Sequence, residues 1–288
     1  MANLFSDSQH GFRPNRGCHT ALERISQAMS SKDPVAVIAI DIAGAFDGVP
    51  HETILSALRT HQVQGYLYRM IRSYLHERST TITHNGNELK VDPMGSYGAP
   101  QGGALSGVLY NLCHKLLHEE IAKVPVDSNT KITHESYCDD STLVIKSLDD
   151  HLPHYIRATL NACAKWEAAT SMNISPQKTK IMIRNSRLNQ HIYFRGHQIE
   201  LCDSLKILGV TFDVKGTFKP HIDAVIRRTK RRTAAMAYYV GKAFGPSSGL
   251  LRQAVKTIIL SSMNHCSSIW FHNCLLYTSD AADELTSG

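Results

Sequence analysis

The hydrophobic pattern of the chain begins with a helical period and then changes to a strand. Apolar residues recur at helical spacing over residues 18–31, which predicts an amphipathic helix. The run PVAVIAIDIAGAF, residues 34–46, begins as a continuous β-branched segment. Such a run is typical of a strand buried on both faces. We therefore expect a helix followed by a central strand.

The next part of the chain predicts helices and a hairpin. Residues 51–76 show two amphipathic helical patterns that Gly65 separates. Residues 79–92 alternate as a strand does, on both sides of the dipeptide Asn85-Gly86. Because an Asn-Gly pair adopts the positive φ angles of a tight hairpin turn, this segment predicts a β-hairpin.

The middle of the chain predicts a long helix and a second hairpin. A glycine-rich turn, GAPQGGALSG, leads into an apolar helix over about residues 104–122. Residues 134–145 predict two strands joined at the pair Asp139-Asp140, and residues 148–171 are helical again.

The last third predicts short strands and then basic helices. The segments TKIMIRN, HIYFRGHQIEL and LKILGVTFD each predict a short strand, and helices are expected at about residues 218–243 and 249–265. This mixture predicts an α+β protein, with antiparallel hairpins and helices packed to one side. The change from strands to basic helices near residue 215 is the candidate domain boundary.

Composition predicts a reducing compartment and gives a weak indication of a polyanionic partner. An apolar fraction of 42% and a charged fraction of 19% are those of an ordinary globular protein. The net charge of +6 is compatible with a polyanionic partner, and residues 226–242 hold six of the basic side chains. Seven cysteines without a CxxC pair favour a reducing compartment, and no apolar run approaches the roughly 20 residues that span a bilayer. We expect an intracellular protein without a membrane segment, whether nuclear or cytoplasmic.

Candidate chemistry lies at two strand ends. Asp41 follows the buried strand beside small residues, and Asp139 and Asp140 occupy the turn of the second hairpin. If these strands pair, the carboxylates of Asp41 and Asp139 should lie within about 6 Å, a metal-sharing distance. Their mutual repulsion would require cations, and magnesium suits carboxylate oxygens together with substrate phosphates. A solvated Asp-Asp turn without chemistry is the alternative.

Six motifs in one order resemble those of a known family. They are GFRPNRGCHTAL, DIAGAFDGVPH, GAPQGGALSGVLYN, YCDD, NISPQKTKIMI and LKILGVTFD. Together they resemble the motifs of reverse transcriptases, most closely those of non-LTR (LINE-type) retrotransposons, over about residues 9–225. The resemblance implies a right-hand polymerase of the reverse-transcriptase type: a palm with partial fingers, then a truncated thumb-like helical region.

The resemblance also implies a domain organisation. Residues 1–33 would be partial fingers, residues 34–215 the palm with finger-like helices at 51–76, and residues 216–273 the thumb-like region. Residues 274–288 have no hydrophobic pattern, and Cys274 to Asp283 resembles a translated sequencing-library adapter. We expect this tail to be non-native and to make few contacts. The fingers segment that precedes Gln9 in the family is expected to be missing.

Carried over residue by residue, the resemblance implies a catalytic centre. Asp41 and Asp139 would bind two magnesium ions, with manganese as an alternative, and Asp140 would assist. Lys178 would protonate the leaving pyrophosphate. Asp47 would be structural, capping the helix that begins near Pro50.

Substrate contacts follow from the same motifs. Phe46 would pack beneath the incoming sugar and reject a 2′-hydroxyl. Residues Pro100, Gln101 and Gly102 would contact template and nucleotide, and Arg13 would lie near the template or triphosphate. A core aromatic at Phe46, a plain helix-entry turn and an exposed arginine are the respective alternatives.

The remaining contacts would involve the primer. Leu208 and Gly209 would form the strand turn that grips it, and the basic helix 224–243 would face a phosphate backbone. A packed hairpin and a solvated helix are the alternatives. The implied partners are an RNA template, a DNA primer and dNTPs; the oligomeric state stays open.

The sequence thus predicts an RNA-directed DNA polymerase that transfers nucleotides by a two-metal mechanism. Two alternatives remain: a catalytically incomplete nucleic-acid-binding remnant, which the missing fingers favour, and an RNA-dependent RNA polymerase, which Phe46 disfavours. Cys138 departs from the alanine or methionine most common in the family. It is small, and we expect it to be tolerated.

Overall fold

The computed structural model describes residues 4–76, 78–91, 95–100, 102–148, 150–187, 190–238, 240 and 245–271. The chain divides into two compact units, Met1–Leu201 and Cys202–Gly288. The change of character near residue 215 therefore falls inside the second unit. The hairpin that precedes residue 215 belongs with the helix that follows it, because Phe212 at its end packs on Phe218 with ring centroids 5.3 Å apart.

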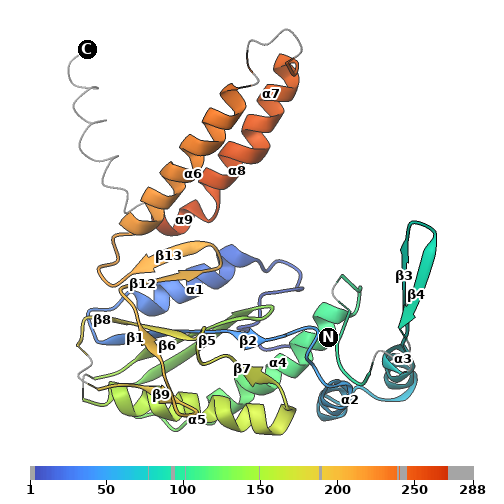
Figure 1. The fold of residues 1–288 in the computed structure, drawn as a ribbon. Helices are drawn as coiled ribbons and strands as arrows, with labels where there is room; N and C mark the ends of the chain where they lie inside the picture. The colour runs from blue at the N-terminus through green and yellow to red at the C-terminus, as the bar shows by residue number, and fades with distance from the viewer. Residues whose placement is uncertain are drawn as a thin grey trace. The chain divides into compact units, whose positions relative to one another are not determined.

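A five-stranded sheet forms the centre of the first unit (Figure 1). Its strands, in spatial order, are β11 (Glu200–Leu201), β8 (Lys180–Arg184), β1 (Val35–Ile40), β6 (Asp140–Lys146) and β5 (Lys131–Tyr137). The middle strand β1 pairs antiparallel with both β6 and β8. Five of its six residues are buried, which confirms the predicted central strand.

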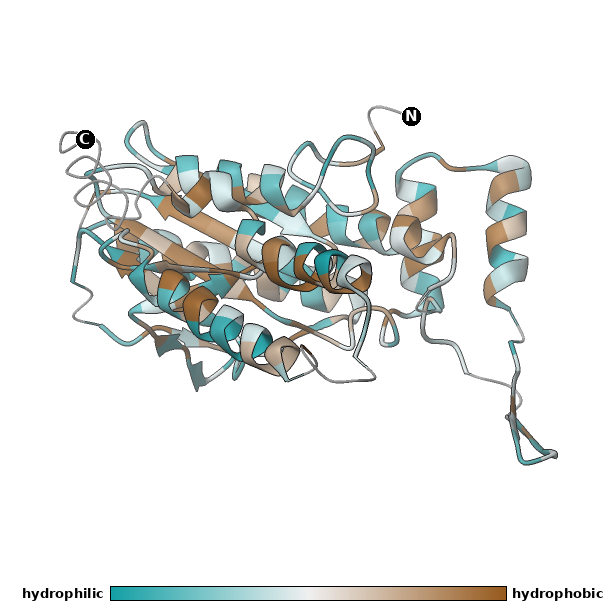
Figure 2. Ribbon diagram, turned by 90° about the horizontal axis from the view of Figure 1, so that it is seen from above, coloured by the Kyte–Doolittle hydropathy of each residue, from teal (hydrophilic) through white to brown (hydrophobic). Residues whose placement is uncertain are grey.

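Helices cover both faces of this sheet, so the expectation that they pack to one side is wrong. Helix α1 (Cys18–Met29) lies on one face, and α4 (Ser106–Ala122) and α5 (Leu152–Thr170) lie on the other (Figure 1). Alternate residues of β1 point to opposite faces, so Ala36 and Ile38 join the core under α4 and α5. Figure 2 shows the contrast between the continuously apolar strands and helices that alternate apolar and polar residues. The observed layers follow from that pattern.

The two helices and the hairpin expected over residues 51–92 form as predicted. Helices α2 (His51–Thr60) and α3 (Gly65–Leu75) are separate, and the strands β3 (Thr80–His84) and β4 (Asn87–Val91) form a hairpin. Its turn residues have positive φ angles, 50° at Asn85 and 78° at Gly86, as an Asn-Gly turn requires. The expected cap by Asp47 is wrong, because Pro50 is the N-cap of α2 and no side chain caps it.

Short strands complete the first unit. Strand β2 (Ile42–Ala43) pairs with β7 (Asn173–Ile174), and β9 (Tyr193–Phe194) pairs with β10 (His197–Gln198). The expected single strand over residues 191–201 is therefore wrong. Arg195 and Gly196 adopt positive φ angles of 50° and 78° and turn the segment back on itself.

Three buried histidines pack between α4 and the edge strand β5. The ring centroids of His118 and His134 are 3.7 Å apart, and that of His114 lies 5.3 Å from His118 and 5.7 Å from His134. Burial lowers the pKa of His114 to about 4. It also lowers the pKa values of His118 and His134, to which neighbouring histidines contribute. All three are therefore neutral at pH 7.

The second unit is a hairpin followed by helices, so the single short strand expected at residues 205–213 is wrong. It comprises β12 (Ser204–Ile207), β13 (Val210–Asp213), α6 (Lys219–Ala237), α7 (Ser248–Ala254), the π-helix η1 (Val255–Leu260), α8 (Ser261–Asn264) and α9 (Ser267–Trp270). The carboxylate of Asp213 accepts hydrogen bonds from the backbone N–H groups of Thr217 and Phe218 and so fixes the start of α6. The expected helix over residues 249–265 is interrupted by η1.

The predicted tail lies outside the described residues, which end at Phe271. Among the helices that are described, none is both long and apolar enough to cross a bilayer.

Candidate active site

Asp41 is placed by the end of the central strand. Strand β1 stops at Ile40, and the chain then pairs through β2 with β7. The backbone N–H of Ser175 donates a 2.8 Å hydrogen bond to the carbonyl of Asp41. This bond holds the backbone at Asp41 between two strand pairings, while its side chain remains 39% exposed.

Asp139 and Asp140 are presented by a tight hairpin. Tyr137 pairs with Asp140, which leaves Cys138 and Asp139 as a two-residue turn. Cys138 has a φ of 56°, the positive angle that such turns require at their first position. Ile40 pairs with Ser141 in this antiparallel pair. The next residues outward, Asp41 and Asp140, therefore lie beside each other. The three aspartates thus lie at one end of the β1–β6 pair.

The electrostatics show the cost of this arrangement. The pKa of Asp140 is raised, first by partial removal from water and then by the negative charges of Asp139 and Asp41. Oδ2 of Asp41 is enclosed and accepts no hydrogen bond from the described residues. Buried oxygens in proteins normally have a partner, so this atom is an exception that calls for a cation or donor.

Lys178 supplies a positive charge beside Asp41. Its ammonium nitrogen lies 3.3 Å from Oδ2 of Asp41. A turn holds it there, since both the backbone N–H and the hydroxyl of Thr179 donate to the carbonyl of Ser175, at 3.0 and 2.8 Å. The structure thus brings Lys178 to Asp41, although the two residues are far apart in sequence.

The donor set fits a hard divalent cation. Asp41, Asp139 and Asp140 offer only carboxylate oxygens, the ligands that magnesium and manganese prefer. Oδ2 of Asp41, which lies near Lys178 but accepts no hydrogen bond from the described residues, is an available ligand atom. Among the described residues, no three side chains of His, Cys, Asp or Glu lie close enough to one another to hold a metal ion.

Phe46 lies between two other aromatic rings. Its ring stacks on Tyr110 with centroids 4.8 Å apart and planes 29° apart. The ring of Phe12 meets it edge-on, at 6.4 Å and 81°. Phe46 is partly buried and packs against the core. The sugar contact stays a prediction, with a core aromatic as its alternative.

Tyr110 is a residue to which the sequence assigned no role. It is fully buried in α4, and its hydroxyl has no hydrogen-bond partner among the described residues. Its pKa is raised well above the usual range, first by burial and then by the charge of Asp139. Only its position in the motif GAPQGGALSGVLYN could have pointed to it.

The glycine-rich turn lies at the start of α4. Gly102 has a φ of 84°, and a side chain at this position would meet no other atom within 4 Å. Pro100 lines a groove of about 280 Å³ together with His51, Arg78 and Tyr97. Gln101 lies outside the described residues. The turn thus offers open backbone beside a groove, as a template contact would need.

Comparison with known proteins identifies the family. The family described as reverse transcriptase (RNA-dependent DNA polymerase) matches residues 1–212. The chain belongs to the reverse transcriptase family. It is 26% identical over 263 residues to the RNA-directed DNA polymerase from mobile element jockey of Drosophila melanogaster, covering 87% of this chain and 28% of the relative. It is 25% identical to the probable RNA-directed DNA polymerase from transposon BS of the same organism, covering 95% and 30%.

A solved structure agrees on the fold. The apo telomerase from Candida tropicalis matches with a TM-score of 0.50 at 9% identity, covering 92% of this chain and 47% of that one. The predicted α+β fold of the reverse-transcriptase type and the resemblance to non-LTR elements are confirmed. Enzymes of this family use divalent metal ions and act on nucleic acid. The chain spans less than a third of the length of these curated relatives.

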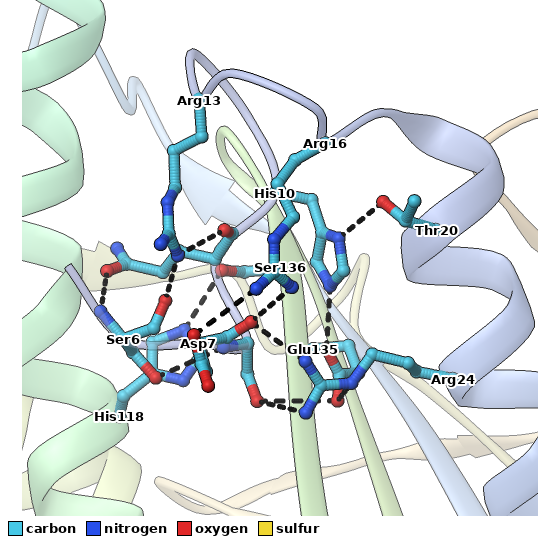
Figure 3. Close-up of polar contacts among 12 residues, drawn as sticks. Ser6, Asp7, His10, Arg13, Arg16, Thr20, Arg24, His118, Glu135 and Ser136 are labelled. Atoms are coloured by element: carbon cyan, nitrogen blue, oxygen red, sulfur yellow. Dashed lines mark hydrogen bonds and ion pairs between the residues drawn. The ribbon is translucent and has the colours of Figure 1, made fainter. Parts of the chain in front are cut away.

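Arg13 of this reverse transcriptase domain points into its own loop (Figure 3). Its guanidinium donates to the carbonyls of Ser6 and Gln9 and lies over the ring of Phe5. Burial and the charge of Arg16 lower its pKa, and Asp7 opposes them. In this structure the side chain orders the loop, and contact with template or triphosphate stays a prediction.

Leu208 and Gly209 form the turn between β12 and β13 in the second unit. Both have positive φ angles, 45° and 88°. Nε2 of His265 donates a 2.9 Å hydrogen bond to the carbonyl of Leu208, and its ring leaves no room for a side chain at Gly209. The grip on a primer stays a prediction.

A basic groove of about 630 Å³ lies in the same unit. Its cationic lining residues are Lys206, Arg227, Arg228, Lys230 and Arg231. Basic residues of α6 thus line this groove, and contact with a phosphate backbone stays a prediction.

Proposed function

We propose that the chain is the catalytic core of an RNA-directed DNA polymerase of a non-LTR retrotransposon. The reaction would be attack of a primer 3′-hydroxyl on the α-phosphate of a dNTP, with release of pyrophosphate. One observation carries this proposal: Asp41, Asp139 and Asp140 lie at the same end of β1 and β6, and Oδ2 of Asp41, beside Lys178, accepts no hydrogen bond from the described residues. Such a site suits a metal-dependent phosphoryl transfer.

Asp41 and Asp139 would hold two magnesium ions, or manganese in their place, with Asp140 assisting. When bound, two divalent ions stabilise the attacking and leaving oxygens of an in-line displacement. The protein supplies position: the β1–β6 pairing fixes Asp41, and the tight Cys138–Asp139 turn fixes the other carboxylates. Positioning and charge are the main contributions that a protein makes to phosphoryl transfer.

Lys178 would provide the proton for the leaving pyrophosphate. Its ammonium already lies beside Asp41, so the transfer requires only a change of partner within the site. Phe46 would present its partly buried ring to the sugar. A 2′-hydroxyl against that ring would lose water without gaining a hydrogen bond, which favours a deoxynucleotide.

The substrates and location of the whole protein belong to the same proposal. The template would be RNA, the primer DNA, and the basic groove of the second unit would contact a phosphate backbone. Manganese could replace magnesium because both accept oxygen ligands. The protein would act inside the cell. Domain roles follow the predicted order of partial fingers, palm and thumb-like helices.

Extension of a DNA primer on an RNA template tests this function. We expect incorporation with dNTPs and magnesium, and none when the template is omitted. Preferential use of NTPs would favour the RNA polymerase alternative. Binding of the primer–template without any extension would favour a remnant that lacks turnover.

A further inference from the structure

A loop near the N-terminus extends the edge of the central sheet. Gln9 forms a parallel bridge with Ser136 of β5. The N–H of His10 donates to the carbonyl of Ser136 at 2.8 Å, and the N–H of Ser136 donates to the carbonyl of Ser8 at 2.9 Å. The loop therefore lies along β5 two residues before the turn that carries Asp139.

A buried polar cluster fastens this loop to α1 and β5 (Figure 3). The carboxylate of Glu135 lies 2.8 Å from Nε2 of His10 and 3.0 Å from Nε of Arg24, and it accepts a hydrogen bond from Ser8. The side chains of His10 and Glu135 are fully enclosed. A buried carboxylate is tolerated only with such partners, so the cluster defines one position for the loop.

Helix α4 holds the loop from its other side. The side-chain amide of Gln9 donates to the backbone carbonyl of Asn111 at 2.7 Å. The side-chain amide of Asn111 donates to the carbonyl of Gly11, also at 2.7 Å. Arg13 then closes the loop through the carbonyls of Ser6 and Gln9. Gly11 is thereby held at a fixed place.

At that place Gly11 lies against the Cys138–Asp139 turn. A Cβ atom added to Gly11 would lie 2.7 Å from both the backbone nitrogen and Sγ of Cys138. Contacts this short do not occur, and the backbone nitrogen cannot rotate away as a flexible side chain could. Cys138 is the first residue of the turn and has a φ of 56°. Glycine is therefore required for the loop to rest on the turn.

We propose that the loop Ser6–Gly11 is a positioning element that fixes the Cys138–Asp139 turn, with Gly11 as the contact residue. This inference rests on the proposed function, because it matters for activity only if Asp139 is catalytic. Its physical content is independent of activity: the loop restricts the motion of the turn.

Hydrogen–deuterium exchange of the whole chain tests the inference, with primer extension as a second readout. The variants are Gly11→Ala, which inserts an atom between loop and turn, and Asn111→Ala, which releases Gly11 without inserting one. Gly249→Ala is the control, because a Cβ there would meet its nearest atom only at 3.9 Å.

Both test variants should exchange the amides of residues 137–141 about tenfold faster or more, while residues 35–40 exchange at the wild-type rate. Their kcat should fall about tenfold or more with the KM for dNTP within about twofold, since misplacement of a catalytic group slows chemistry more than binding. The control should match wild type.

Unchanged exchange of residues 137–141 in both variants would overturn the inference. So would faster exchange throughout the sheet, which would indicate a purely structural role. If wild type does not extend primers, the proposed function fails, and the exchange data still decide whether the loop restrains the turn.

Discussion

The ammonium nitrogen of Lys178 lies 3.3 Å from Oδ2 of Asp41, an oxygen that accepts no hydrogen bond from the described residues. Both side chains are partly exposed, at 69% and 39%, so the pair contributes little to stability. We propose that its role is functional. The lysine stands beside the same oxygen that would bind a metal ion, and the two cations compete for it.

Replacing Lys178 with glutamine should separate these two roles. We expect kcat to fall about 100-fold, the usual loss when a general acid is removed. The magnesium concentration for half-maximal activity should fall about two- to fivefold, because a competing charge is gone. Lys180→Gln is the control. Lys180 begins strand β8, two residues after Lys178, and its ammonium pairs with Glu200. Equal kcat in Lys178→Gln and wild type would exclude the acid role.

The sheet could be predicted from sequence because its pattern is local. The β-branched run of β1 and the Asn85-Gly86 turn each determine one conformation with little help from distant residues. The carboxylates could be predicted for the same reason, since Asp41 follows a strand and Asp139 lies in a turn.

What could not be predicted depends on contacts between distant segments. The requirement for glycine at position 11 appears only when Cys138 is beside it. The stack of Phe46 on Tyr110 joins residues 64 positions apart. The pattern of residues 191–201 predicts one strand, but the chain turns at Arg195, whose residue type carries no marker of a positive φ.

Phe46→Ala should relax sugar selection. Removing the ring opens space beneath the sugar, so the ratio of kcat/KM for dNTP over NTP should fall about tenfold or more. Phe46→Tyr keeps the ring and should keep the ratio within about threefold of wild type. Steady-state kinetics of single-nucleotide addition measure both. A wild-type ratio in Phe46→Ala would mean that the ring serves only to pack on Tyr110.

Acid should destabilise the first unit through its buried histidines. The pKa of His114 is about 4 in the folded protein, whereas an unfolded histidine titrates near about 6.5. The unfolded state therefore binds more protons, and the stability that is complete above about pH 6.5 is lost progressively as the pH falls toward about 4.

His114→Phe should flatten that dependence. Near pH 5 the slope of unfolding free energy against pH should decrease by about 1.2 kcal/mol per pH unit. The reason is that the variant no longer takes up nearly one proton at this position when it unfolds. Denaturant titrations at pH 5, 6, 7 and 8 measure it. His19→Phe, at an exposed position, is the control. An unchanged slope in His114→Phe would contradict the burial argument.

The basic groove should contribute salt-dependent affinity. Arg227→Ala combined with Arg231→Ala should weaken primer–template binding equally for all sequences, because phosphate contacts carry no sequence information. The slope of log K against log salt should become shallower by about 0.7–0.9 for each phosphate that the groove no longer neutralises. Lys256→Ala, an exposed lysine outside the groove, should keep the wild-type slope. A wild-type slope in the double variant would exclude the groove as a phosphate-binding surface.

Single-turnover addition of one dNTP to a DNA primer on an RNA template, compared between Asp139→Asn and Asp150→Asn, tests the central claim most directly. Asp150 is an exposed carboxylate beyond the far end of β6, so its variant should retain the wild-type rate with magnesium. Asp139→Asn should lose at least about 1000-fold in rate, because a metal ligand is removed while the hairpin is kept. An Asp139→Asn rate equal to that of Asp150→Asn would contradict the assignment of catalysis to this carboxylate site.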